Sequence, residues 1–313
     1  MEKEDTLDTL DTLDTLDTLD TLDTLDTLDT LDTLDTHTQD DGLDFLINGI
    51  SNIAIKNKIS DNNSLEKQEI INLFLTNVKG KEIKLDNYNA SHCGKEGHWL
   101  EKQMNIKQNQ KNLPDINGFE MKKETNSVTT FIDKVPSKKL LLGNIIKPKE
   151  KVNKLIFWNM FGSKKQSDEV TLGGWKINKY DNNGQILVVD KDNNIQIIYN
   201  YIEDKRKNKS EIIDDFYKLE KQIILQWNME DIKKCIDNKF NVKGFFICKK
   251  NNASASYNKI CFGKAFSFEQ WINDVKLGKI YYDGYSKCNG RWRGCFRANN
   301  TYWNLLLIPN EEY

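Results

Sequence analysis

The chain is poor in the residues that build zinc sites and disulfide frameworks. It has three histidines and six cysteines, and no two cysteines form a Cys-x-x-Cys pair. Structural zinc sites and disulfide-rich folds depend on such residues at short, regular spacings, so neither class fits. His92, Cys93 and His98 have the side chains of a metal site, but a trio of this kind is usually incidental. Free thiols suit a reducing cytoplasm, where we expect the protein.

Long apolar segments are also missing. No run of about 18 apolar residues is present, so we expect no membrane span. The first residues, Met-Glu-Lys-Glu-Asp, lack the basic and apolar regions of a secretory signal. With 313 residues and 38% hydrophobic residues, the chain can form one large domain or two modest ones with a real core.

Residues 5–36 repeat the triplet Asp-Thr-Leu. A period of three matches neither the 3.6-residue helix nor the two-residue strand, so no continuous apolar face forms. Every third residue is an uncompensated aspartate, which favours a disordered acidic tail over residues 1–41. A β-solenoid is the alternative, although single triplets are short for its repeating unit. We expect no catalytic role for the repeat.

The acidic tail hides a basic body. The whole chain has 45 basic and 47 acidic residues, and residues 1–41 hold fifteen of the acidic residues and one of the basic ones. Residues 42–313 therefore carry 44 basic and 32 acidic side chains, a net charge of +12. Such a charge suits a polyanion such as DNA. The alternative is a lysine-rich composition that reflects an AT-rich genome.

The residues with the clearest chemistry lie in Pro114–Lys122. Glu120 and Lys122 are two apart, so in a strand their side chains share a face. Asn117-Gly118 is a tight-turn signal that would fold Asp115 back beside Glu120. Two carboxylates suit Mg2+, and the lysine can orient or deprotonate the attacking water. The alternative is a solvated hairpin edge, because short charged patterns arise often by chance.

The segment before this motif strengthens the first interpretation. Gly97–Glu101 opens a helical pattern, and Glu101 precedes Asp115 by fourteen residues. A helical glutamate followed by Pro-Asp and Glu-x-Lys resembles the MvaI/BcnI-type, LlaMI-like restriction endonucleases of the PD-(D/E)XK superfamily, and the related mismatch-repair nickase MutH. The resemblance covers about Gly94 to Arg297. It implies that Glu101, Asp115, Glu120 and Lys122 are catalytic and that Asp115 and Glu120 bind the metal.

A second motif lies near the end of the chain. Tyr281–Arg297 is rich in glycine, aromatic residues and arginine, and its place in the chain is similar to that of the family's recognition loop. Arginine reads guanine and asparagine reads adenine, and glycines allow the backbone to approach a groove. The alternative is an exposed hairpin with arginines stacked on its aromatic rings. The DNA-binding candidates are Lys287, Asn289, Arg291, Arg293 and Arg297.

The pattern of elements predicts an α/β fold with a substantial antiparallel part. The resemblance implies a restriction-endonuclease-like core, with a mixed sheet flanked by helices, and a separate recognition lobe. We expect the helices and catalytic core in residues 42–170 and the recognition lobe in residues 171–313. The expected helices are Gly42–Ser60, Ser64–Val78, Glu211–Trp227, Asp231–Asn238 and Phe266–Leu277. The expected strands are Lys81–Leu85, Ser127–Ile132, Gly244–Cys248 and a three-stranded meander over Gly173–Tyr201.

The resemblance implies a type II restriction endonuclease that uses Mg2+ to cut double-stranded DNA at a short, CCNGG-like site. It further implies a monomer whose functional partner is a cognate DNA methyltransferase. No histidine follows His98, so the family's recognition histidines have no clear counterparts. The alternatives are a MutH-like nicking enzyme of mismatch repair and a catalytically inactive DNA-binding protein. A methyltransferase gene next to this one would favour restriction.

Deleting residues 2–41 should leave specific DNA cleavage intact, because no catalytic candidate lies there. The deletion removes about fourteen net negative charges, so non-specific DNA affinity at low salt should stay equal or rise. Cleavage assays and DNA titrations with the full and shortened chains measure both effects. A shortened chain that no longer folds would show that the repeat is structural.

Overall fold

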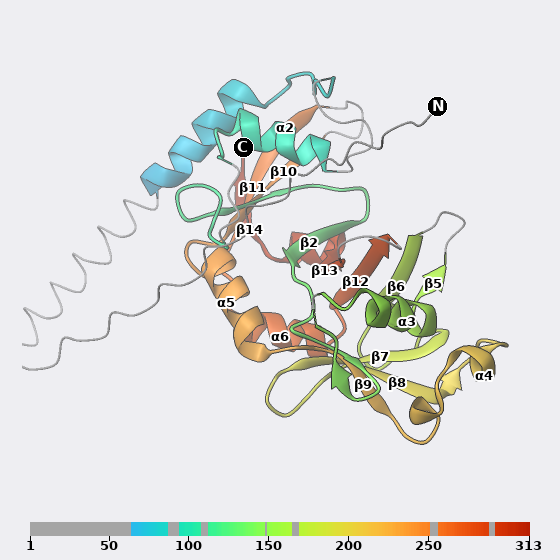
Figure 1. The fold of residues 1–313 in the computed structure, drawn as a ribbon. Coiled ribbons are helices and arrows are strands. Elements are labelled where there is room, and N and C mark those ends of the chain that lie inside the picture. Colours follow the sequence, from blue (N-terminus) through green and yellow to red (C-terminus); the bar gives the residue numbers. More distant parts are fainter. Residues whose placement is uncertain are drawn as a thin grey trace, which may run out of the picture. The chain divides into compact units, whose positions relative to one another are not determined.

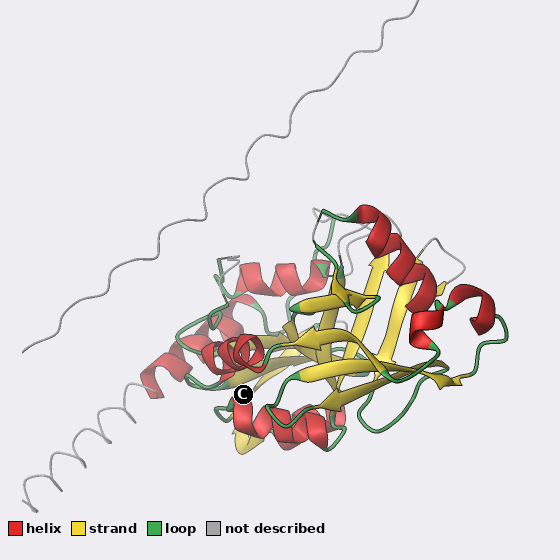
Figure 2. Ribbon diagram, turned by 60° about the horizontal axis from the view of Figure 1, so that its bottom comes forward, coloured by secondary structure: helices red, strands yellow, loops and turns green. Residues whose placement is uncertain are grey.

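The computed structural model describes residues 64–86, 94–107, 112–147, 149–164, 169–250, 256–287 and 292–313. All of them belong to one compact unit, Ile55–Tyr313. The repeat, the expected helix Gly42–Ser60 and the candidates Asn289 and Arg291 lie outside the described residues. Strands occupy the middle of the unit and helices its periphery (Figures 1 and 2). Over the described ranges, no helix is long and apolar enough to span a bilayer.

The first sheet contains the catalytic candidates. Its order is β1 (Glu120–Lys123), β10 (Phe245–Lys250), β11 (Tyr257–Gly263) and β14 (Leu307–Glu312). The β1–β10 pair is parallel and the other pairs are antiparallel, so the sheet is mixed. A helix over residues 64–77 and α2 (Lys95–Gln103) bury apolar side chains in one core with Met121 and Phe246.

Two five-stranded antiparallel sheets complete the fold. The second sheet has the order β2 (Val128–Asp133), β13 (Arg293–Asn299), β12 (Ile280–Lys287), β6 (Glu169–Trp175), β5 (Ser163–Lys164). The third has the order β4 (Asn144–Ile145), β3 (Lys138–Leu141), β9 (Gln222–Trp227), β8 (Ile195–Asp204), β7 (Asn183–Val189). Residues 42–170 and 171–313 both contribute strands to all three sheets. The sheets therefore do not settle the expected division into two lobes, which stays a prediction.

The helices surround one large core that joins the second and third sheets to strand β10 of the first sheet. Their bounds are α3 (Lys151–Phe161), α4 (Lys209–Ile212), the short 3-10 helix η1 (Asp215–Tyr217), α5 (Met229–Phe240), α6 (Phe268–Lys276) and α7 (Asn300–Leu305). Aromatic rings fill the centre of this core. The Phe131 ring of β2 stacks on Trp303 with 4.1 Å between centroids and packs edge-on against Phe240 of α5. The second sheet is thus fixed against the helix that reaches the first.

Most expected elements are confirmed. Helices form at 64–77, α2, α5 and α6, and strands form at β2, β7, β8 and β10. The meander is confirmed in its second and third strands, which pair as β7 and β8. Its first strand was expected to begin at Trp175. Instead, β6 ends at Trp175 and belongs to the other antiparallel sheet. The expected mixed α/β architecture is confirmed.

Two expectations are wrong. Residues 222–227 form β9, a central strand, rather than the end of a helix from Glu211 to Trp227. Their β-branched and aromatic side chains suit a strand, and Ile224, Leu225 and Trp227 are completely buried. Residues 81–85 form no strand. The chain turns at Gly80, whose φ is +71°, and the next apolar side chains pack on the core without a partner strand.

Candidate active site

The candidate active site begins at the turn before β1. Asn117 and Gly118 have φ values of 51° and 82°, which is the backbone of the type I′ turn that favours Asn-Gly. Phe119 N donates to Ile116 O at 2.8 Å and closes the turn. The chain then returns so that the Met121 amide donates to Asp115 Oδ2 at 2.8 Å. The expected folding of Asp115 back onto the strand is confirmed.

Glu120 and Lys122 face the same side of β1, as their spacing predicted. Lys122 Nζ donates to Glu120 Oε1 at 2.9 Å and to the Phe131 carbonyl of β2 at 3.1 Å. The Glu120 side chain is 3% exposed and that of Lys122 13% exposed. The pair is therefore a nearly dry ion pair that is anchored to the second sheet.

A second lysine, which sequence reasoning missed, completes the cluster. Lys239 lies near the end of α5, and its Nζ contacts Glu120 Oε1 at 3.1 Å. The helix itself was expected, but Lys239 and Glu120 are 119 residues apart. No local pattern distinguishes this lysine from the many others in the chain, so only the packing of α5 against β1 identifies it.

The charges in this cluster shift the pKa values of the two carboxylates in opposite directions. Burial and the nearby charge of Glu120 raise the pKa of Asp115 to about 6. Burial alone would also raise the pKa of Glu120, but the charges of Lys122 and Lys239 hold it below its usual value. Burial would lower the pKa of Lys239, yet the two carboxylates keep it raised. Near pH 7 both acids are therefore ionised, and Asp115 is the one that takes up a proton first.

The residues present fit a small divalent cation. Glu120 Oε2 is buried and has no hydrogen-bond partner, which is costly for a charged oxygen unless a ligand takes the position. Asp115 supplies a second carboxylate next to it. Nowhere in the described ranges do three or more His, Cys, Asp or Glu side chains form a metal-binding group. Mg2+ commonly binds through one or two carboxylates and retains water, which matches a pair of this kind.

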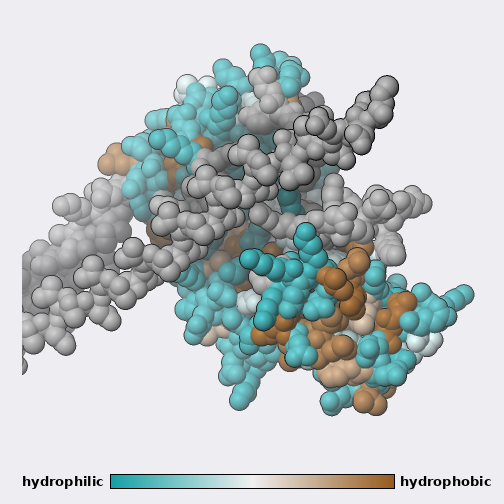
Figure 3. All heavy atoms as spheres, in the orientation of Figure 1, coloured by the Kyte–Doolittle hydropathy of each residue, from teal (hydrophilic) through white to brown (hydrophobic). Residues whose placement is uncertain are grey.

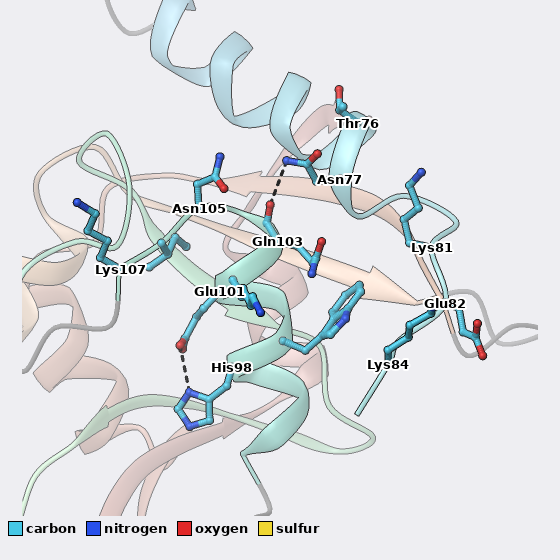
Figure 4. Close-up of a pocket in the computed structure, with 13 residues that line it drawn as sticks. Thr76, Asn77, Lys81, Glu82, Lys84, His98, Glu101, Gln103, Asn105 and Lys107 are labelled. Atoms are coloured by element: carbon cyan, nitrogen blue, oxygen red, sulfur yellow. Dashed lines mark hydrogen bonds and ion pairs between the residues drawn. The ribbon is translucent and has the colours of Figure 1, made fainter. Parts of the chain in front are cut away.

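Glu101 is the fourth catalytic candidate. It is on α2, and its Oε2 is 3.2 Å from His98 Nδ1 (Figure 4). In the described part of the chain, no hydrogen bond or ion pair joins Glu101 to Asp115, Glu120 or Lys122. Its side chain is 32% exposed and points into a surface hollow. The catalytic role of Glu101 stays a prediction.

Three of the five DNA-binding candidates belong to the β12–β13 hairpin of the second sheet, whereas Asn289 and Arg291 lie outside the described residues. Arg293 begins β13 and is exposed. Arg297 is half-buried, and its Nη1 donates to Asp283 Oδ2 at 2.8 Å while its Nε donates to Cys295 Sγ. The Lys287 backbone ends β12. These five residues stay candidates, with Arg297 already engaged by the hairpin.

Comparisons with known proteins identify the family of the chain and a related fold. Residues 78–310 match the LlaMI restriction endonuclease family. The type II restriction enzyme ScrFI of Lactococcus lactis subsp. cremoris is 34% identical over 268 residues, which are 77% of this chain and 97% of that protein. The fold is similar to that of restriction endonuclease MvaI in a complex with its cognate DNA substrate. That likeness has a TM-score of 0.51 and 12% identity, and covers 79% of this chain and 96% of that one.

If Asp115 holds a cation, its raised pKa predicts that the binding depends on pH. Below about pH 6 the folded protein holds a proton on Asp115 that a cation must displace. The apparent Mg2+ affinity should therefore fall about tenfold for each pH unit below 6 and level off above it. Mg2+ titrations from pH 5 to 8 measure this. In Asp115→Asn the remaining affinity should be weak and should lose this dependence, whereas an unchanged pH profile would contradict the assignment.

Proposed function

Because this chain belongs to the LlaMI restriction endonuclease family, we propose that it is a type II restriction endonuclease that uses Mg2+ to hydrolyse phosphodiester bonds in double-stranded DNA at a short specific site. One observation carries the chemistry. A type I′ turn and a short strand bring Asp115, Glu120 and Lys122 together, and one buried oxygen of Glu120 has no hydrogen-bond partner.

Asp115 and Glu120 would hold the cation. Glu120 stays ionised because two lysines contact it, and Asp115 is ionised near pH 7 because its pKa is about 6. Bound there, Mg2+ would act as a Lewis acid that offsets negative charge at the phosphate. The residues of the chain thus present two ionised ligands in a site that excludes most water.

Lys122 would position the attacking water. Its ammonium group has three donors, two of which are used by Glu120 Oε1 and the Phe131 carbonyl. These two bonds fix the direction of the third donor, which can hold the water or a phosphate oxygen. Lys239 shares Glu120 Oε1 and leaves the other carboxylate oxygen open. We assign Lys239 a positioning role, since its ammonium group contacts Glu120.

The β12–β13 hairpin would read the sequence of the duplex. It carries the arginine-rich segment expected to contact bases, and β13 pairs directly with β2. The family resemblance supports a CCNGG-like site, a monomeric enzyme with one active site and a cognate methyltransferase that protects host DNA. Digestion of DNA of known sequence, followed by mapping of the cut ends, tests both the activity and the site.

Removing either proposed metal ligand should stop cleavage without removing DNA binding. Asp115→Asn and Glu120→Gln should each lower the cleavage rate by at least about a thousandfold, and Lys122→Met by about a hundredfold or more. Binding of the mapped site in Ca2+ should persist in all three. Glu312→Gln, which removes a carboxylate from an exposed ion pair with Lys259, is the matched control and should cut normally. Normal cleavage by Asp115→Asn would refute the assignment.

The arginines near the hairpin should fall into two groups. An arginine that contacts a guanine edge contributes about 1–3 kcal/mol of discrimination, whereas one that contacts phosphate weakens all sequences alike. Ala variants of Arg291, Arg293 and Arg297 are compared on cognate and scrambled duplexes in Ca2+. We expect at least one to lose cognate affinity alone, with Arg293 favoured over Arg297 because Asp283 and Cys295 already engage Arg297. Equal losses on both duplexes for all three would mean that the hairpin only clamps the backbone.

A further inference from the structure

A hollow of about 1040 Å³ lies between the helix over residues 64–77 and α2, on the part of the unit that carries the active site. Figure 4 shows its rim, which is formed by the end of the first helix, the segment after it and the exposed side of α2. Its cationic side chains come from two separate stretches of the chain. They are Lys81, Lys84, Lys102 and Lys107.

These four lysines differ from most lysines around the active site. Lys122, Lys123, Lys239 and Lys243 each form an ion pair with a carboxylate. All four lysines in the hollow are exposed. Among the described residues, none of them has an ion pair or a side-chain hydrogen bond. Two glutamates share the hollow, and one of them, Glu101, is bonded to His98. The hollow therefore presents an excess of unneutralised positive charge.

The surroundings suit a charged ligand rather than an apolar one. In Figure 3 hydrophobic side chains gather on the lower part of the visible face, where Figure 1 places α3 and the third sheet. The upper part, which carries the first helix, is mainly hydrophilic. Amide groups of Asn77, Gln103 and Asn105 also line the hollow and can bond to phosphate oxygens. Dispersed lysines with amide donors are typical of contacts to a nucleic-acid backbone.

The first helix connects the hollow to the catalytic turn and gives the separation between them. Its Glu69 accepts a hydrogen bond of 2.9 Å from Asn117 in the catalytic turn, and its Asn77 donates to Gln103 O at 3.1 Å in the hollow. Eight residues of α-helix span about 12 Å. Phosphates of one DNA strand follow each other by about 3.4 Å along the duplex axis. The hollow thus lies about 12 Å along this helix from the catalytic turn, which equals the axial rise of three to four base pairs.

We propose that this hollow binds the phosphate backbone of the duplex on one side of the cut, beyond the base pairs nearest to it. The proposal rests on the proposed function, because it takes the ligand to be the DNA that Asp115 and Glu120 act on. It adds a second, sequence-independent contact, which is built from lysines that lie outside the β12–β13 hairpin. Flanking DNA then contributes to affinity without contributing to specificity.

The test combines lysine variants with duplexes of different length. One variant carries Lys81→Gln, Lys84→Gln, Lys102→Gln and Lys107→Gln. It is titrated in Ca2+ with duplexes that carry the mapped site and flanks of about two or about twelve base pairs, since only the longer flank reaches the hollow. We expect affinity for the long duplex to fall about tenfold or more at low salt, and its salt dependence to lose about two to four units of slope. Affinity for the short duplex should change less than about twofold.

A matched control carries Lys233→Gln and Lys259→Gln. It is compared with the double variants Lys81→Gln/Lys84→Gln and Lys102→Gln/Lys107→Gln, each of which removes the same number of positive charges. Lys233 and Lys259 are paired with surface carboxylates and do not line the hollow, so their loss changes the net charge and leaves the hollow unchanged. The control should weaken long and short duplexes alike and only slightly. Equal weakening of both duplexes by the hollow variants, or no weakening of either, would overturn the proposal.

Cleavage distinguishes this proposal from the proposed function. The variants should still cut the short duplex at the wild-type rate, which also shows that they are folded. If the wild-type protein binds long duplexes better than short ones through these lysines but cuts neither, the proposed activity fails and the hollow remains a DNA site. If it cuts both equally well and the variants bind like wild type, the activity stands and the hollow is not a DNA site.

Discussion

The structure depends on one buried carboxylate that two lysines hold in place. Glu120 is 2% exposed, and moving a charge that far from water is unfavourable unless it is paired. Lys122 reaches it from the same strand and Lys239 from α5, both at the same oxygen. The pairing leaves Oε2 with a full share of negative charge and no donor. The two ion pairs offset the cost of burying the carboxylate, and the unpaired oxygen remains open to a cation.

The same contacts join the candidate active site to the hairpin proposed to read the DNA. The Phe131 carbonyl that accepts from Lys122 belongs to β2, and β2 pairs with β13 of the arginine-rich hairpin. The Phe131 ring packs between Phe240, which follows Lys239, and Trp303. A shift of the hairpin on DNA would therefore act on both lysines through one rigid strand. Buried aromatic packing makes such a strand move as a unit, because close-packed interiors do not deform gradually.

The sequence predicted those parts of the site that are local. Asn117-Gly118 specifies its own turn, and the two-residue spacing of Glu120 and Lys122 specifies a shared face, so both could be predicted without the fold. Lys239 could not, because its place depends on how α5 packs against β1. The segment 222–227 was misjudged since a short apolar run fits a buried helix or a central strand equally well. The lysines of the hollow come from two stretches of the chain, and no spacing in the sequence shows that they lie together.

The parallel pairing of β1 with β10 also has a consequence for the time at which the enzyme becomes active. Glu120 is in register with Phe245, and the same sheet is finished by β14 close to the last residue. A ribosome that adds about 5–20 residues per second needs roughly 6–25 s to pass from one strand to the other. Until then the nascent β1 has no neighbour, and neither Lys239 nor the sheet can hold Glu120. The cluster around Glu120 therefore cannot assemble before Phe245 and its strand have been synthesised.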